Sequence, residues 1–231
     1  KGSIVVLNRF DGSILSMNSN PTFDAQVFED RDNDTINSLL NDPEKPLFNR
    51  AFNGFYPPGS VFKPIPALLG LKKNMINEKT EVFCSGSTSL ADRNYYCWKK
   101  GGHGKVNLKK AIKESCDCYF YELAKKINID DLSELATNLG LNDTYNIGLS
   151  NAQKGLIPNK KWKKTNLEQG WYQGETLITS IGQGYNLTSP LQLASLYSAL
   201  LNGGRFPSPK LIKNEPSKYL GEELNSNHQK A

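Results

Sequence analysis

Long hydrophobic runs are absent from this sequence. No stretch reaches the roughly 18 consecutive apolar residues that a membrane-spanning helix needs. The chain opens on Lys1-Gly2-Ser3 instead of a basic and then apolar leader, so we expect a soluble piece without a signal peptide. The hydrophobic fraction of 38% is nevertheless enough for a substantial core, in one large domain or two small ones.

Histidine is also scarce. The two histidines are His103 and His228, and neither falls in a Ser-His-Asp order with supporting motifs, which argues against a histidine-based serine hydrolase. The net charge of +5 comes with lysine pairs spread along the chain, and no basic stripe is interleaved with aromatic residues. We therefore expect solvated lysine faces and no nucleic-acid partner.

The strongest chemical signal is Ser60-Val61-Phe62-Lys63, the single Ser-x-x-Lys string of the sequence. Residues three apart lie on one face of a helix, so the Lys63 amine can reach the Ser60 hydroxyl and accept its proton. Burial lowers the pKa of a lysine and makes it a workable base for such a hydroxyl. The spacing therefore predicts a serine nucleophile with a lysine base.

The residues before Ser60 favour this interpretation. Pro57, Pro58 and Gly59 prevent a helix from extending backwards, so Ser60 is expected at a helix N-terminus. Free N–H groups at that end suit a developing oxyanion. The alternative is a serine that only caps the helix, beside an exposed lysine.

A second motif, Ser115-Cys116-Asp117, lies between two segments with apolar residues at helical spacing. Turn residues and capping residues delimit further elements. We expect helices at 61–73, 108–114, 117–127, 130–140 and 190–202, and two short strands at 3–8 and 13–18 around the turn dipeptide Asp11-Gly12. Within the first of these helices, Pro66 is expected either to distort the hydrogen-bond ladder or to mark a short irregular segment.

Together the two motifs resemble those of class B penicillin-binding proteins, whose transpeptidase domain carries Ser-x-x-Lys followed by Ser-x-Asn, or by Ser-x-Asp in the cell-elongation subgroup. Three further segments resemble segments of this family and occur in the same order along the chain. They are Asn41-Asp42-Pro43 through Asn49-Arg50-Ala51, Ser180-Ile181-Gly182-Gln183-Gly184, and Thr188-Ser189-Pro190-Leu191-Gln192-Leu193-Ala194. The resemblance covers nearly the whole chain and points to the elongation type, penicillin-binding protein 2. It implies an α+β fold, an antiparallel sheet flanked by helices, that is shared with serine β-lactamases.

The resemblance also implies an activity, peptidoglycan D,D-transpeptidation during cell elongation. Ser60 would attack the D-alanyl-D-alanine carbonyl of a donor stem peptide, and β-lactam antibiotics would acylate the same serine. Lys63 would be the base, Ser115 would relay the proton toward the leaving amine, and Asp117 would contact Lys63 in place of the usual asparagine. The family works as a periplasmic domain of an inner-membrane-anchored protein, with an MreC-like scaffold and a RodA-like glycosyltransferase as partners.

One family motif is missing. The third motif, Lys-Thr/Ser-Gly, belongs to a strand across the cleft from the nucleophile, and the nearest string here, Lys164-Thr165-Asn166, lacks the glycine and comes too early. We therefore expect residues 1–231 to be part of a transpeptidase domain, truncated before the third-motif strand and the C-terminal part.

The cysteines indicate a metal site. Cys84, Cys97, His103 and Cys116 form C-x12-C-x5-H-x12-C, which supplies the four ligands that a structural zinc ion prefers, although at wider spacing than in compact zinc fingers. Elongation-type members of the resembled family include examples with zinc beside the active site, so the resemblance implies structural zinc here. A Cys84–Cys97 disulfide is the alternative, because the family works in the oxidising periplasm. Cys118 is expected to be a packed core thiol.

Two other functions stay open. A serine β-lactamase shares Ser-x-x-Lys but also needs a group that activates the deacylating water. In class A enzymes this group is the glutamate of a Glu-x-x-Leu-Asn motif, and the sequence has no such motif. The second is a non-catalytic, zinc-stapled scaffold that binds other cell-wall proteins, which the missing third motif suggests.

Overall fold

The computed structural model describes residues 1–150, 152–212 and 214–224; His228 lies outside this range. Helices and short two-stranded sheets make up the described part of the chain. The helices are α1 (Gln26–Glu29), α2 (Asn33–Asn41), the 3-10 helix η1 (Gly59–Phe62), α3 (Pro64–Lys72), α4 (Leu108–Lys113), α5 (Asp117–Ala124), α6 (Ile129–Asn138), α7 (Lys160–Leu167), α8 (Gln173–Ser180) and α9 (Pro190–Leu201). The strands are β1 (Gly2–Leu7), β2 (Ile14–Asn20), β3 (Val82–Cys84), β4 (Ser87–Leu90), β5 (Arg93–Tyr96), β6 (Gly104–Val106), β7 (Phe206–Pro207) and β8 (Tyr219–Leu220).

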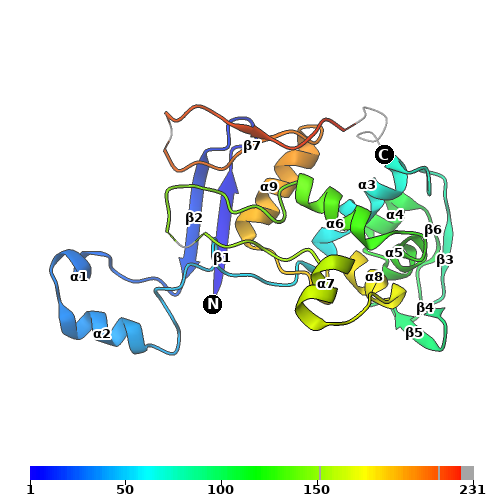
Figure 1. Ribbon diagram of the computed structural model, residues 1–231, viewed down its shortest axis with the longest axis horizontal. Coiled ribbons are helices and arrows are strands. Elements are labelled where there is room, and N and C mark those ends of the chain that lie inside the picture. The colour runs from blue at the N-terminus through cyan, green and yellow to red at the C-terminus, as the bar shows by residue number, and fades with distance from the viewer. Residues whose placement is uncertain (151, 213, 225–231) are drawn as a thin grey trace.

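The elements gather into two groups (Figure 1). The antiparallel hairpin β1–β2 packs against α9, and β7 pairs with β8 nearby. Helices α3 to α8 and the hairpin-like pairs β3–β6 and β4–β5 form a helical lobe on the other side, while α1 and α2 project away from both groups. The predicted N-terminal hairpin and all five predicted helices are confirmed, with ends that differ by at most three residues.

The centre of the helical lobe is α5. Seven of its eight residues are buried, and it packs against α3, α4 and α8. Helix α3 is equally apolar on all sides, and at Gly70 the absence of a side chain lets Ile76 and Leu123 come close. Because α3 and α5 are buried together, the residues at their N-terminal ends are held firmly beside each other.

Of the two possibilities that Pro66 raised, a short irregular segment is found before α3. The predicted helix at 61–73 is split into η1 and α3, and α3 begins at Pro64, so both prolines occupy the first turn of α3. The N–H groups of a first turn have no partner within the helix, so proline costs nothing there. The break between η1 and α3 falls at Lys63.

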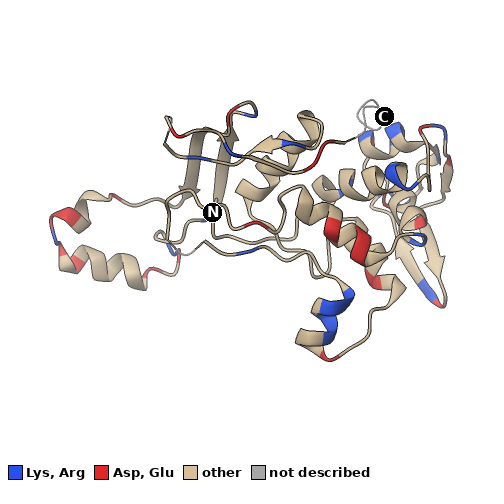
Figure 2. Ribbon diagram, turned by 45° about the horizontal axis from the view of Figure 1, so that its top comes forward, with Lys and Arg blue, Asp and Glu red and all other residues tan. Residues whose placement is uncertain are grey.

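Lysine and arginine side chains are distributed over several elements, with one local concentration on α7 (Figure 2). One of them, Lys163, is buried and forms an ion pair with Glu175 of α8 at 2.6 Å. Another, Lys160, pairs with Asp130 of α6 at 3.3 Å. Among the described residues, none of the helices is long and apolar enough to cross a membrane.

Candidate active site and metal cluster

Ser60 lies in η1, at the mouth of a cavity of about 510 Å³ that is also lined by Trp98, Ser115, Asp117 and Gln183. The turn before it is fixed by the Ser180–Gly184 segment, because Gly59 N–H donates a hydrogen bond to the Gly182 carbonyl at 2.8 Å. Gly182 has φ +72°, and a Cβ atom there would overlap the Gly59 carbonyl oxygen. Glycine is therefore required where this segment meets the serine turn.

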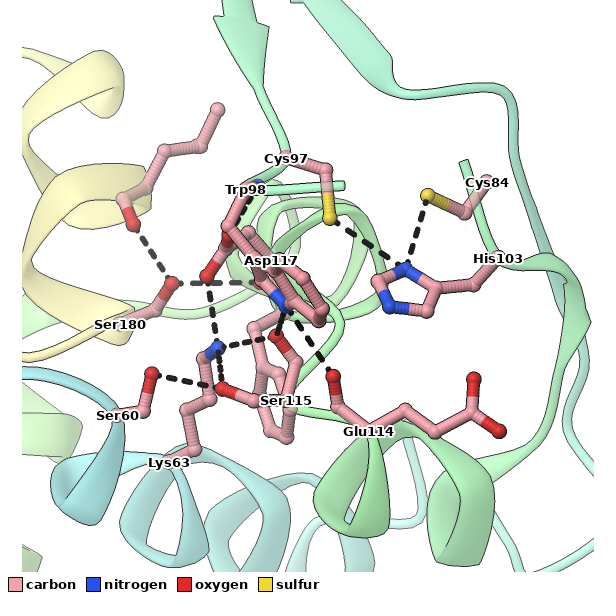
Figure 3. A network of polar contacts seen from close by, with 12 residues as sticks. Ser60, Lys63, Cys84, Cys97, Trp98, His103, Glu114, Ser115, Asp117 and Ser180 are labelled. Carbon is pink, nitrogen blue, oxygen red and sulfur yellow. Dashed lines mark hydrogen bonds and ion pairs between the residues drawn. The ribbon is translucent and has the colours of Figure 1, made fainter. Parts of the chain in front are cut away.

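Lys63 is buried, with 1% of its surface exposed, and its amine is surrounded by oxygen atoms. The Nζ atom donates to Asp117 Oδ1 at 2.7 Å, to Ser115 Oγ at 2.8 Å and to the Ser115 carbonyl at 2.9 Å (Figure 3). A buried lysine is tolerated only with such partners. This arrangement excludes the alternative of a capping serine beside an exposed lysine.

Ser115 connects Lys63 to Ser60. Its hydroxyl donates to Ser60 Oγ at 2.7 Å and accepts from Lys63 Nζ, so the three side chains form a chain of hydrogen bonds. The direct bond between Lys63 and Ser60 is in the backbone, from the Lys63 N–H to the Ser60 carbonyl at 3.2 Å, whereas the three hydrogen bonds of Lys63 Nζ go to Ser115 and Asp117. Ser115 has φ +52°, a left-handed conformation that is uncommon outside glycine, and it lets both its hydroxyl and its carbonyl face Lys63.

Trp98 is a site residue whose role the sequence did not reveal. Its backbone N–H donates to Asp117 Oδ2 at 3.0 Å, and its indole N–H donates to the carbonyls of Ser115 at 3.1 Å and Glu114 at 3.2 Å. Asp117 thus uses one oxygen for Lys63 and the other for Trp98. The sequence contains no signal for these contacts, which depend on the fold of the loop between β5 and β6.

The four predicted metal ligands do come together. The ligand atoms of Cys84, Cys97, His103 and Cys116 all lie within 4.8 Å of one another, and all four residues are buried. His103 Nδ1 is 3.6 Å from Cys84 Sγ and 3.5 Å from Cys97 Sγ (Figure 3). All four cysteines of the chain are free, so the alternative Cys84–Cys97 disulfide is not formed. A buried cluster of three thiols and one imidazole could hold a metal ion.

The surroundings of the cluster affect its thiols differently. Burial opposes ionisation of Cys84, but hydrogen bonds from the side chain and backbone of His103 outweigh it and lower the pKa of Cys84 to about 6. For Cys116, burial dominates and raises the pKa to about 12. Cys118 is a buried core thiol as predicted, and burial raises its pKa.

The cluster and the serine site are covalently linked. Cys116 stands between Ser115 and Asp117, and Cys97 precedes Trp98. The rings of Trp98 and His103 also meet edge to face, with centroids 5.4 Å apart. Any ion bound by the cluster would therefore fix the two segments that position Lys63.

The family described as penicillin binding protein transpeptidase domain matches residues 2–230. Two relatives named peptidoglycan D,D-transpeptidase MrdA match 92% of this chain, the one from Haemophilus influenzae at 38% identity and the one from Escherichia coli K12 at 35%. The chain spans about a third of the length of these relatives, 33% and 34% respectively.

Solved structures agree with these matches. The penicillin-binding protein PBP2 from Helicobacter pylori matches with a TM-score of 0.91 and 34% identity over 100% of this chain and 44% of that chain. The α+β transpeptidase fold expected from the resemblance is thereby confirmed. The chain belongs to the penicillin-binding protein transpeptidase family.

Proposed function

We propose that this chain carries the nucleophile of a peptidoglycan D,D-transpeptidase of the elongation type. The observation that supports this most is the chain of hydrogen bonds from exposed Ser60 through Ser115 to buried Lys63, which ends on Asp117. These contacts support Ser60 as the nucleophile, Ser115 as the proton relay and Lys63 as the base, and both serines line the cavity.

In the proposed reaction, Ser60 Oγ attacks the carbonyl between the two D-alanines of a donor stem peptide. Lys63, in its neutral form, takes the serine proton through Ser115, and the proton then returns through Ser115 to the nitrogen of the leaving D-alanine. An ester bond to Ser60 forms as the peptide bond breaks. Asp117 holds Lys63 in place, and the Ser60 N–H supplies one oxyanion donor. A second donor would come from the family's third-motif strand.

Covalent labelling by a fluorescent penicillin tests this proposal, because a β-lactam acylates the serine as a substrate mimic. The full-length protein should be labelled with one penicillin per molecule, and Ser60→Ala should abolish labelling while the protein stays folded. Labelling that survives Ser60→Ala would place the nucleophile elsewhere. Rapid multiple turnover of nitrocefin would indicate a β-lactamase instead.

We also propose that the Cys84–Cys97–His103–Cys116 cluster binds structural zinc. In a tetrahedral site with Zn–S near 2.3 Å and Zn–N near 2.0 Å, nitrogen and sulfur ligands lie about 3.5 Å apart. The distances from His103 Nδ1 to Cys84 Sγ and Cys97 Sγ, 3.6 and 3.5 Å, fit this value. The ion would cross-link two segments of the chain. It would not take part in catalysis, because four protein ligands leave no open coordination position on zinc.

We infer partners and location from the relatives. One matched structure is a complex between PBP2 and MreC from Helicobacter pylori, at 34% identity, and another, at 29% identity, is described as a peptidoglycan synthase complex that coordinates polymerization and crosslinking. An MreC-like scaffold and a RodA-like glycosyltransferase are therefore the proposed partners, in the periplasm of a cell whose inner membrane anchors the full-length protein. Pull-down of such proteins by the full-length protein tests this.

A further inference from the structure

A second cleft, larger than the Ser60 cavity, lies between the β4–β5 hairpin and α8. Its volume is about 1070 Å³, and tyrosines are its most frequent lining residues. We call it the tyrosine cleft, after the residues Tyr95, Tyr96, Tyr121, Tyr172 and Tyr185.

The walls of the tyrosine cleft are braced from behind. The rings of Tyr95 and Tyr121 are 5.5 Å apart, and Tyr185 packs on Trp162 with centroids 5.0 Å apart. Tyr96 and Tyr172, in contrast, are 70% and 67% exposed. Two large aromatic rings are thus presented to solvent on a rigid base, which is the arrangement of a surface that binds a partner.

The tyrosine cleft is a neighbour of the Ser60 cavity. Tyr96 and Tyr121 line both of them. A molecule held in the tyrosine cleft would therefore lie next to the cavity of the nucleophile.

The charges of the tyrosine cleft are balanced. Glu175 is engaged by Lys163 at 2.6 Å and by the Tyr172 N–H at 2.8 Å, and the hairpin tip carries one acid, Asp92, beside one base, Arg93. With flat aromatic rings and no surplus of either sign, the cleft suits a peptide with apolar and polar groups better than a polyanion.

We propose that the tyrosine cleft is the acceptor subsite, which holds the stem peptide whose free amine attacks the acyl group on Ser60. This rests on the proposed transpeptidase function. In the step concerned, the amine nitrogen forms a new amide bond with the acyl carbon, and the bond from that carbon to Ser60 Oγ breaks. The proton lost by the amine returns to Ser60 Oγ through Ser115. The acceptor needs a space beside the one in which the acyl group is bound, and the tyrosine cleft lies beside the Ser60 cavity.

Two variants of the full-length protein test this, and both residues line the tyrosine cleft without lining the Ser60 cavity. Tyr172→Ala removes an exposed ring, and Asn94→Trp fills part of the cleft from β5. The assay uses a soluble donor peptide ending in D-alanyl-D-alanine and an acceptor peptide with a free side-chain amine. It separates transfer to the acceptor from hydrolysis of the acyl-enzyme. Phe83→Ala is the matched control, an aromatic of the same lobe that is 71% exposed on β3.

We expect the KM for the acceptor to rise about tenfold in both variants, as the loss of one aromatic contact predicts, and the products to shift toward hydrolysis. The rate of acylation by penicillin should stay within about twofold, since that step takes place in the Ser60 cavity. Phe83→Ala should change neither. An unchanged acceptor KM in folded variants would overturn the subsite. A loss of stability without a change in the acceptor KM would also overturn it, because this would indicate that another part of the protein or a partner covers the cleft. Failure of penicillin to label the unsubstituted protein would instead refute the proposed function.

Discussion

Lys63 has three oxygen atoms around its amine, and two of them belong to Ser115. The remaining oxygen, Asp117 Oδ1, carries the negative charge that offsets the cost of burying the lysine. The other oxygen of this carboxylate, Oδ2, accepts a hydrogen bond from the Trp98 backbone N–H. A carboxylate can accept from both donors, whereas an amide can offer an oxygen to only one of them.

Replacing Asp117 should therefore reveal both roles. We expect Asp117→Ala to lower the free energy of unfolding by about 3 to 5 kcal/mol, because it leaves a buried charge unpaired. Asp117→Asn should cost less, since its single oxygen can still serve Lys63. Urea unfolding measures both. The control is Asp131→Ala, which breaks the partly exposed ion pair with Lys73 at 2.7 Å and should cost no more than about 1 kcal/mol. Equal losses for Asp117→Ala and Asp131→Ala would contradict the importance of the buried pair.

Ser115 is predicted to matter for rate and not for stability. Ser115→Ala removes the hydroxyl between Lys63 and Ser60, and loss of a proton relay should slow acylation by penicillin about 10²- to 10⁴-fold. Stopped-flow labelling measures the rate, and thermal unfolding should show little change, since the Ser115 carbonyl still accepts from Lys63. Ser89→Ala, at an exposed serine of β4, is the control. Acylation at the normal rate in Ser115→Ala would remove Ser115 from the proton path.

The sequence predicted the residues of this site better than their connections. The Ser-x-x-Lys spacing and the Ser-Cys-Asp string bring Ser60, Lys63, Ser115 and Asp117 together as expected. The order of the contacts could not be predicted, because it depends on the left-handed backbone of Ser115, which no local pattern indicates. The role of Trp98 was missed for the same reason, since a loop conformation decides where its indole lies.

Among the helices and strands, α5 has the most connections to the site. Its N-terminal end carries Asp117, and the cluster residue Cys116 immediately precedes it, so a metal ion bound by the cluster would tie α5 to β3 through Cys84 and to the end of β5 through Cys97. A short strand pair such as β3–β6 has little stability of its own and needs such a cross-link.

Removal of the metal should therefore affect stability and acylation together. We expect a strong chelator or Cys116→Ser to lower the free energy of unfolding by at least about 3 kcal/mol, a Tm decrease of about 10 °C, because binding of structural zinc is itself folding free energy. Elemental analysis should find one zinc per chain, and Cys118→Ala should retain it. Protein purified without chelator that contains no zinc, or that forms a Cys84–Cys97 disulfide, would refute the site but leave the Ser60 chemistry untouched.

The contact between the Ser180–Gly184 segment and the serine turn can be tested separately. Gly182→Ala should lower acylation by about 10²-fold, because the added methyl group would displace Gly59 and with it Ser60. Gly101→Ala is the control, since a Cβ atom there meets nothing within 4 Å. A Gly182→Ala enzyme with a normal acylation rate would show that the position of Ser60 does not depend on this contact.

Regular apolar spacing or clear capping residues predicted the N-terminal hairpin and the helices α4, α5, α6 and α9, whereas α3 was predicted although it is apolar on all sides. Helix α2 was missed although it has an apolar face and Asp32 caps its N-terminal end. Helix α7 was missed because its sequence, Lys160–Leu167, is mostly lysine and polar residues, although it buries Lys163 against Glu175. The strands β3 to β6 have only three or four residues each, too few for an alternating pattern to be recognised.

Three distant parts of the chain meet at Ser60. The serine turn, the Ser-Cys-Asp motif and the Ser180–Gly184 segment are joined by the contacts from Ser60 to Ser115 and from Gly59 to Gly182. An antiparallel bridge between Tyr56 and Thr188 connects the same turn to the segment that enters α9. No local pattern in the sequence indicates these long-range contacts, and only the resemblance to a known family suggested that the motifs share one site.

The proposal that Ser60 is the nucleophile of the folded protein is tested most directly by locating the bond that penicillin forms. The full-length protein is incubated with benzylpenicillin, digested, and analysed by mass spectrometry, with Ser60→Ala treated in parallel. We predict one penicilloyl adduct per chain, on the peptide that contains Ser60, and no adduct in Ser60→Ala. An adduct on another residue, or a folded and zinc-loaded protein that forms none, would contradict the proposed function.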